Sequence, residues 1–154
     1  MNRIIAFLAC AMLFIACKKE TVSVPGPLTD GQMLYMLQDK KWQQVDERFK
    51  DTAGTMFINF WKYSNPDYAR DNYFTWYSNK GYVINDYLKK TPGITNPVID
   101  TGSWSLKDGI ITQVSNNNFF SYYPLKIDTI TLNQLVLKFG FNDTTVWQTF
   151  EIIE

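Results

Sequence analysis

Histidine is absent from this chain of 154 residues, and cysteine occurs only twice. Without histidine there is no histidine-ligated zinc, no histidine general base and no Ser-His-Asp triad. Fifteen basic and fifteen acidic residues give a formal net charge of zero, so the chain lacks the basic surplus that captures nucleic acid. The motifs of phosphate-binding loops, serine hydrolases and calcium loops are missing too. We therefore expect a protein that is not an enzyme, uses no cofactor or metal and binds no nucleic acid.

Charged residues are also scarce, at 19%, whereas aromatic residues reach 16%. This composition is typical of a packed core rather than a disordered chain. The length suits one folded domain.

The chain starts with a short basic segment, followed by an unbroken apolar run from Ile4 to Ala16. As a helix this run would be about 20 Å long, too short for the ~30 Å hydrocarbon core of a bilayer. We therefore predict that residues 1–16 are an export signal. Its ending, Leu-Phe-Ile-Ala before Cys17, resembles the lipobox of bacterial lipoproteins. The resemblance implies that the signal is cut before Cys17 and that its sulfur carries a diacylglyceryl group; the alternative is a secreted protein cut elsewhere.

Residues 17–29 are expected to be the lipidated cysteine and a flexible tether, because Pro25-Gly26-Pro27 continues neither a helix nor a central strand. Lys18 stands where aspartate favours the inner membrane in some bacteria, so we expect an outer-membrane anchor, with the domain facing the periplasm or the cell surface. Cys10 would leave with the signal, and the mature chain would then have no disulfide. The folded domain is expected to be residues 30–154.

A short helix is predicted from Gly31 to Lys40, with Asp30 as its N-cap. One face carries apolar residues at helical spacing, namely Met33, Leu34, Met36 and Leu37. This face is either a lid over a binding site or a surface packed on a sheet edge or barrel end.

From residue 41 onward apolar residues alternate with period two, and turn residues recur every eight to twelve positions. The expected strands are 41–49, 55–62, 72–77, 81–88, 99–106, 110–115, 119–130, 133–141 and 144–153. Tight turns are predicted at Asp108-Gly109 and Asn142-Asp143, and a hairpin loop at Ser78-Asn79-Lys80. The pattern predicts an all-β fold, an eight- or nine-stranded antiparallel up-and-down barrel with a short N-terminal helix.

Four motifs carry a resemblance to the lipocalin-like domains of small lipoproteins of Gram-negative bacteria. They are L-x-x-K-x-W from Leu37 to Trp42, the Asn79–Tyr82 hairpin, G-x-W-x-L from Gly102 to Leu106, and the apolar pattern from Ile130 to Leu137. The resemblance covers most of the chain after the tether. It implies a lipocalin-like barrel at the cell envelope, and it implies no particular substrate.

Large side chains are expected inside the barrel, at Trp104, Leu106, Leu135, Leu137, Phe139 and Phe141. Two of the expected strands also carry aromatic residues on both faces. On 55–62, Phe57 and Trp61 share one face and Phe60 lies on the other; on 72–77, Tyr73 and Tyr77 share one face and Phe74 and Trp76 the other. Some of these rings should therefore form an exposed binding patch unless other segments cover them. The candidate ligand- or partner-binding residues are Trp61, Tyr63, Tyr73, Trp76, Tyr77, Tyr82 and Tyr87.

Three functions are compatible with these patterns. The first is a lipid-anchored, non-enzymatic barrel that binds a small apolar or amphipathic molecule or a glycan. The second is an accessory subunit that docks on an outer-membrane complex through the Tyr/Trp patch. The third is a hydrolase with two converging carboxylates, although Asp108 and Asp143 fall in turns and Asp46, Glu47 and Glu151 have no marked partner in the sequence.

Overall fold

The structure, a computed structural model, describes residues 27–57, 70–87, 95–117 and 123–154. The described part contains one helix, α1 (Asp30–Leu37), and nine strands. The strands are β1 (Trp42–Lys50), β2 (Met56–Phe57), β3 (Tyr73–Trp76), β4 (Gly81–Asn85), β5 (Val98–Lys107), β6 (Ile110–Ser115), β7 (Leu125–Ile130), β8 (Gln134–Phe141) and β9 (Thr144–Ile152).

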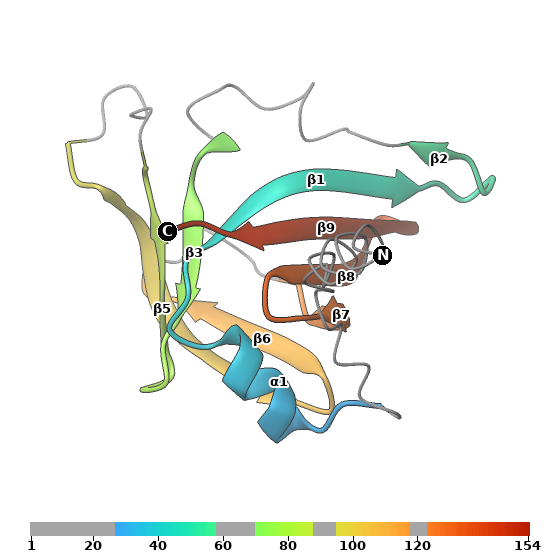
Figure 1. The fold of residues 1–154 in the computed structure, drawn as a ribbon. Coiled ribbons are helices and arrows are strands. Elements are labelled where there is room, and N and C mark those ends of the chain that lie inside the picture. Colours follow the sequence, from blue (N-terminus) through green and yellow to red (C-terminus); the bar gives the residue numbers. More distant parts are fainter. Residues whose placement is uncertain (1–26, 58–69, 88–94, 118–122) are drawn as a thin grey trace, which may run out of the picture.

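The strands form a closed antiparallel barrel, which confirms the predicted fold class (Figure 1). The ring runs β1-β3-β4-β5-β6-β7-β8-β9 and closes where β9 pairs with β1. β2 is an extra strand that pairs with the end of β1, outside the ring. Closure leaves neither β1 nor β9 as an unpaired edge.

Two seams divide the ring into halves, β3-β4-β5-β6 and β7-β8-β9-β1. Among the described residues, β1 pairs with β3 only at Trp42 and Gln43, and β6 pairs with β7 only at Ile110 and Ile111. Both seams lie at the barrel end that carries α1, and β1 then turns away from β3 (Figure 1). The two half-barrels are therefore joined most closely at the α1 end and less closely at the opposite end, which we call the far end.

The predicted tight turns are confirmed in position and conformation. Asp108 and Gly109 have φ values of 54° and 71°, and Asn142 and Asp143 have 46° and 61°. Two successive left-handed residues give a turn whose twist matches that of the strands it joins. Asn and Asp tolerate this conformation better than other side chains except glycine.

The helix differs from its prediction at both ends. Its N-cap is Thr29 rather than Asp30, because Thr29 and Gln32 form a reciprocal capping box. It ends at Leu37 rather than Lys40, and Asp39 takes a left-handed φ of 57° as the chain turns toward β1. The apolar face of the helix packs on the barrel end, which is the second of the two predicted alternatives. Leu37 is fully buried, and Met33, Leu34 and Met36 pack against the core.

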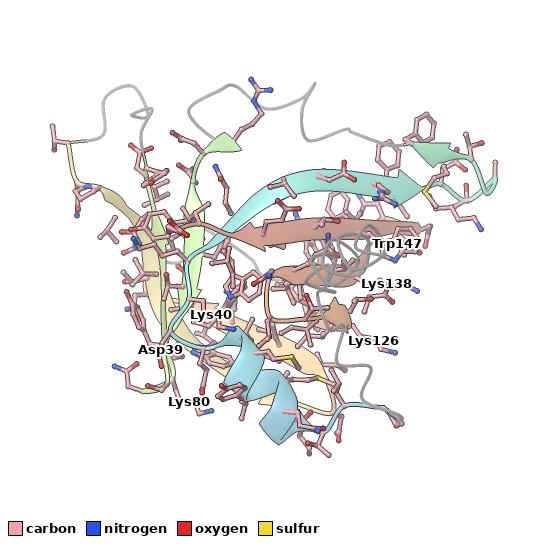
Figure 2. All side chains as sticks on the ribbon, viewed as in Figure 1. Asp39, Lys40, Lys80, Lys126, Lys138 and Trp147 are labelled. Carbon is pink, nitrogen blue, oxygen red and sulfur yellow. The ribbon has the colours of Figure 1, made fainter. Side chains whose placement is uncertain are left out.

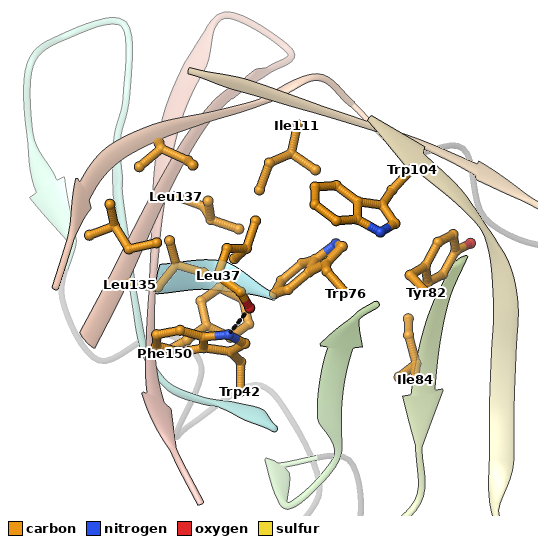
Figure 3. Packing of buried hydrophobic residues seen from close by; sticks show 12 residues of the cluster. Leu37, Trp42, Trp76, Tyr82, Ile84, Trp104, Ile111, Leu135, Leu137 and Phe150 are labelled. Atoms are coloured by element: carbon orange, nitrogen blue, oxygen red, sulfur yellow. Dashed lines mark hydrogen bonds between the residues drawn. The ribbon is translucent and has the colours of Figure 1, made fainter. Parts of the chain in front are cut away.

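The core fills the α1 end of the barrel (Figure 3). Its largest members are Trp42, Trp76, Trp104, Tyr82 and Phe150. Trp42 Nε1 donates a 2.9 Å hydrogen bond to the Leu37 carbonyl. Of the residues expected inside, Trp104, Leu135 and Leu137 are buried, and Leu106 packs partly against the core. Phe139 is half-buried.

Phe141 follows the inward alternation of Leu137 and Phe139 on β8, as expected, but it is not buried. It is the last residue of β8, at the far end, and its side chain is 45% exposed. Within the described ranges no helix is both long and apolar enough to span a bilayer.

Candidate functional site

The inner face of the half-barrel β3–β6 also carries polar residues, beside the core and beyond it toward the far end. Cross-strand partners point to the same face of a sheet. Gly102 pairs with Ser115, and Trp104 pairs with Gln113, so Gln113 and Ser115 share the inner face with Trp104. Asp100 and Asp86 continue the inward alternation of β5 and β4, and both are almost completely buried.

Asp100 is the centre of a buried hydrogen-bond cluster. Its Oδ2 accepts a 2.7 Å hydrogen bond from Tyr82 Oη, and its Oδ1 accepts one of 2.8 Å from Ser115 Oγ. Asn117 Nδ2 donates to the same Oδ1 at 3.3 Å. The Tyr82 ring lies over Gly102, where a Cβ would overlap it. A missing side chain on β5 thus lets a tyrosine from β4 reach the carboxylate.

The opposite half-barrel carries a second polar group, formed by Gln44, Glu47 and Gln148. Glu47 Oε2 accepts hydrogen bonds of 3.2 Å from Gln44 Nε2 and 2.9 Å from Gln148 Nε2. Two residues three positions apart would ordinarily face opposite sides of a strand. Here a bulge between Gln44 and Asp46 shifts the register and brings Glu47 inward, opposite Gln148.

Among the residues that the structure describes, two buried N–H donors lack an acceptor: Gln113 Nε2 and Trp76 Nε1. Gln113 is 7% exposed and Trp76 is 1% exposed. Both adjoin Trp104, because Gln113 pairs with it and the Trp104 indole donates a 3.0 Å bond to Tyr77, the residue after Trp76. A buried donor without an acceptor costs about 1–3 kcal/mol. Because nearly all buried N–H groups in folded proteins donate a hydrogen bond, we expect an acceptor for each of these two donors.

We call the inward polar residues that lie beside the core and beyond it, toward the far end, the polar layer. It comprises Gln44, Glu47, Tyr82, Asp86, Asp100, Gln113, Ser115 and Gln148. Next along β1, β9 and β8 comes an apolar row, in which Phe49 pairs with Val146 and Val146 pairs with Phe139. Phe57 stacks on Phe49 at 4.5 Å and Tyr123 stacks on Phe139 at 6.1 Å between ring centroids, which extends the row at both ends.

The carboxylates of the polar layer face no basic residue of the described strands. The strand register directs the basic side chains of these strands to the outer face: Arg48, Lys50, Lys107, Lys126 and Lys138. Arg48 pairs there with Asp46 at 2.8 Å, and Lys138 Nζ lies 5.2 Å from the Trp147 ring centroid (Figure 2). The polar layer thus contains three carboxyl groups, those of Glu47, Asp86 and Asp100, and none of the basic side chains of the described strands.

The predicted aromatic patch is not one surface. Trp76 and Tyr82 were expected to contribute to an exposed patch, and this is wrong: both are 1% exposed and lie in the core. They pair directly across β3 and β4 on the inner face. The predicted division of faces on β3 explains the result, because Trp76 takes the inner face and Tyr73 the outer.

Three of the predicted residues lie on the outer side of β3 and β4, namely Tyr73, Tyr77 and Tyr87. Tyr73 and Tyr87 meet edge to face, with ring centroids 5.6 Å apart, and Tyr77 is 38% exposed. Burial, then the neighbouring Tyr77 and Tyr87, raises the pKa of Tyr73 above its ordinary value. These three tyrosines are the part of the predicted Tyr/Trp patch that lies on the outer side of the barrel. Docking of an accessory subunit through them stays a prediction.

The remaining predicted site residues, Cys17, Trp61 and Tyr63, lie outside the described residues, as does the signal at 1–16. Most of the polar layer was missed by the sequence interpretation. The available signal was a polar residue at an inward position of an alternating strand, as at Gln113 between Ile111 and Ser115. Glu47 was considered without a partner, because Gln148 lies 101 residues away.

Neither protein-family models nor curated protein sequences give a match to this chain. The class of the protein is therefore defined by its fold and its interior: an eight-stranded antiparallel barrel, covered at one end by a helix, with a polar layer beside its core and beyond it. The resemblance to lipocalin-like lipoproteins stays a prediction.

Proposed function

We propose that this chain is a lipid-anchored envelope lipoprotein whose barrel binds a small amphipathic molecule without catalysing a reaction. The observation that carries the proposal is the buried amide nitrogen of Gln113, which points into the barrel interior and has no acceptor. A ligand oxygen at this position would remove the penalty of the unpaired donor.

The order of residues along the barrel supports an amphipathic ligand. The polar layer adjoins the apolar core, because Gln113 pairs with Trp104. On β1, β8 and β9 it is followed by the apolar row, with Phe49 and Phe139. Small-molecule sites are typically apolar and aromatic, with a few polar groups that fix the orientation of the ligand. A molecule with a polar head for the polar layer and a short apolar part for the apolar row matches this arrangement.

The hydrogen bonding of Asp100 supports binding rather than catalysis. A general acid or base must reach a proton on the substrate. Asp100 is fully buried, and both of its oxygens already accept hydrogen bonds from neutral donors. Glu47 is likewise held by two glutamine amides.

The anchor in this proposal is a diacylglyceryl group on Cys17, which would hold the barrel at the outer membrane. Two or three acyl chains give stable anchoring, because each buried methylene contributes about 0.8 kcal/mol. The test is the distribution of the full chain between the membrane and soluble fractions of a Gram-negative host. Cys17→Ser is expected to move the protein out of the membrane fraction, whereas Cys10→Ser leaves it there. Retention of the Cys17→Ser protein in membranes would refute the anchor.

Binding is tested with 6-propionyl-N,N-dimethyl-2-naphthylamine, a neutral amphipathic molecule whose carbonyl oxygen can accept a hydrogen bond and whose fluorescence changes when it leaves water. The protein is the full chain carrying Cys17→Ser, which has no acyl chains to compete for the probe. We expect saturable binding to one site, weakened about tenfold by Gln113→Leu, which corresponds to one lost hydrogen bond of about 1.4 kcal/mol.

Thr112→Leu is the matched control, because it adds the same side chain on the outer face of the same strand. It is expected to leave the affinity unchanged. Absence of saturable binding, or equal weakening by both variants, would contradict a binding site at the polar layer.

A further inference from the structure

We propose that the head of the ligand is uncharged and bears hydroxyl groups, as in a sugar or polyol joined to an apolar chain. This inference rests on the proposed binding function and specifies its ligand. It follows from two properties of the barrel interior. Some hydrogen-bond donors of the polar layer and of the neighbouring Trp76 lack an acceptor, and some oxygens of the polar layer can accept a hydrogen bond.

The interior presents both unmatched donors and carboxylate acceptors. Gln113 Nε2 and Trp76 Nε1 require an acceptor, while Glu47, whose two amide donors both bond to Oε2, can take a further hydrogen bond from a donor. A hydroxyl group both donates and accepts. One hydroxyl can therefore accept from the glutamine or indole nitrogen and donate to an oxygen of the polar layer, and neighbouring hydroxyls on one ring or chain can repeat the pattern.

A carboxylate or phosphate head fits less well. It would accept from Gln113 and Trp76, but it would enter an interior that already holds Glu47, Asp86 and Asp100. Like charges in a low-dielectric interior repel one another strongly. The basic side chains of the described strands, such as Lys126 and Lys138, lie on the outer face (Figure 2).

An ammonium head fits less well for the opposite reason. It would be attracted to the carboxylates, but it has no lone pair to offer. Gln113 Nε2 and Trp76 Nε1 would then stay unpaired next to a bound cation, with donor facing donor. An uncharged hydroxyl-bearing head is the class that satisfies both sets of groups.

The apolar row determines what is attached to the head. Phe49, Val146 and Phe139 lie one layer nearer the far end than Glu47 and Gln148 on the same strands. An alkyl or aryl group that leaves the polar layer in this direction would lie against phenylalanine rings and be removed from water, which favours binding. A single water molecule could also satisfy Gln113, but it would bring no apolar group to this row.

The experiment compares three probes with the same eight-carbon tail: octyl β-D-glucoside, octanoate and octyltrimethylammonium. Each is titrated into the full chain carrying Cys17→Ser, below its micelle concentration, with intrinsic tryptophan fluorescence and calorimetry as readouts. We expect the glucoside to bind about tenfold or more tightly than either charged probe. Gln113→Leu should remove most of this preference, and Thr112→Leu should keep it.

Equal or tighter binding of octanoate or octyltrimethylammonium overturns the inference and leaves the proposed function standing. Binding of the naphthylamine probe with no binding of the glucoside overturns the inference alone. Absence of binding for all four probes overturns the proposed function as well and assigns the Gln113 site to water. A preference for glucoside that Thr112→Leu lowers as much as Gln113→Leu also overturns the inference, because the preference would then not arise at the polar layer.

Discussion

The carboxylate of Asp30 accepts a 2.9 Å hydrogen bond from the backbone N–H of Gly109, which lies 79 residues further along the chain. The N–H of Asp108 donates to the other oxygen of the same carboxylate at 2.8 Å. The first turn of α1 is thereby fixed to the turn between β5 and β6. This contact holds the helix over the barrel end beside the seam between β6 and β7.

Replacement of Asp30 should therefore weaken the attachment of α1 to the barrel. Asp30→Ala leaves two turn N–H groups without their charged acceptor, and we expect the free energy of unfolding to fall by about 1–3 kcal/mol. Urea denaturation measures the change. Asp128→Ala removes an exposed carboxylate from β7, and it should change the unfolding midpoint little; an equal effect of the two variants would rule out a specific role of the Asp30 contact.

A glycine on β5 offers a second comparison. A Cβ at Gly102 would overlap the Val114 carbonyl oxygen and the Tyr82 ring, whereas a Cβ at Gly140 would meet nothing within 4 Å. Gly102→Ala must displace backbone or a buried ring, so we expect destabilisation by about 1–3 kcal/mol or more. Gly140→Ala should be neutral or slightly stabilising, because alanine restricts the unfolded chain. Thermal unfolding of the two variants tests this, and a stable Gly102→Ala protein would show that β5 can move away from Tyr82.

The hydroxyl of Tyr82 should stabilise the fold through its 2.7 Å bond to Asp100. Tyr82→Phe keeps the ring over Gly102 but removes one donor from a fully buried carboxylate, with an expected loss of about 1–3 kcal/mol. Tyr77→Phe removes a hydroxyl from a ring that is 38% exposed and should cost little. Denaturant titrations of both variants give the comparison, and a neutral Tyr82→Phe would contradict the stabilising role of this pair.

Tyr73 predicts a loss of stability at alkaline pH. Its pKa in the folded protein is raised above the ordinary value of 10.0, chiefly by burial and further by Tyr77 and Tyr87. Above pH 10 the native state thus retains a proton that the unfolded state releases, so the free energy of unfolding falls as the pH rises through this window. The stabilising contribution is fully present below pH 10.

Tyr73→Phe should make this decline above pH 10 less steep. Measuring unfolding free energies at several alkaline pH values tests the expectation. Tyr35→Phe alters an exposed ring on α1 and should keep the decline of the unsubstituted protein. An unchanged decline in Tyr73→Phe would show that other groups cause it.

The strands could be predicted from the sequence because their signals are local. Alternation of period two together with turns such as Asp108-Gly109 and Asn142-Asp143 determines where a strand ends and the next one begins. The same alternation placed Trp76 and Tyr73 on opposite faces of β3. It could not tell which face becomes the interior, because that depends on how the whole sheet closes.

The polar layer could not be predicted for a related reason. Glu47 faces inward only because a bulge shifts the register after Gln44, and its donor Gln148 comes from the last strand. Asp100 depends on Tyr82, which reaches it only because Gly102 has no side chain. These relations join residues that are distant in the sequence, whereas an inward glutamine such as Gln113 does leave a local signal.

The most direct test of the account is an NMR titration of the nitrogen-15-labelled full chain carrying Cys17→Ser with octyl β-D-glucoside. The indole N–H of Trp76 and the side-chain amide of Gln113 are assigned from Trp76→Phe and Gln113→Leu. The account predicts that both resonances shift with one common saturation curve, whereas the indole N–H of Trp147, on the outer face beside Lys138, stays in place. Resonances of Trp76 and Gln113 that do not move while the glucoside binds, or shifts confined to Trp147, would contradict a binding site at the polar layer.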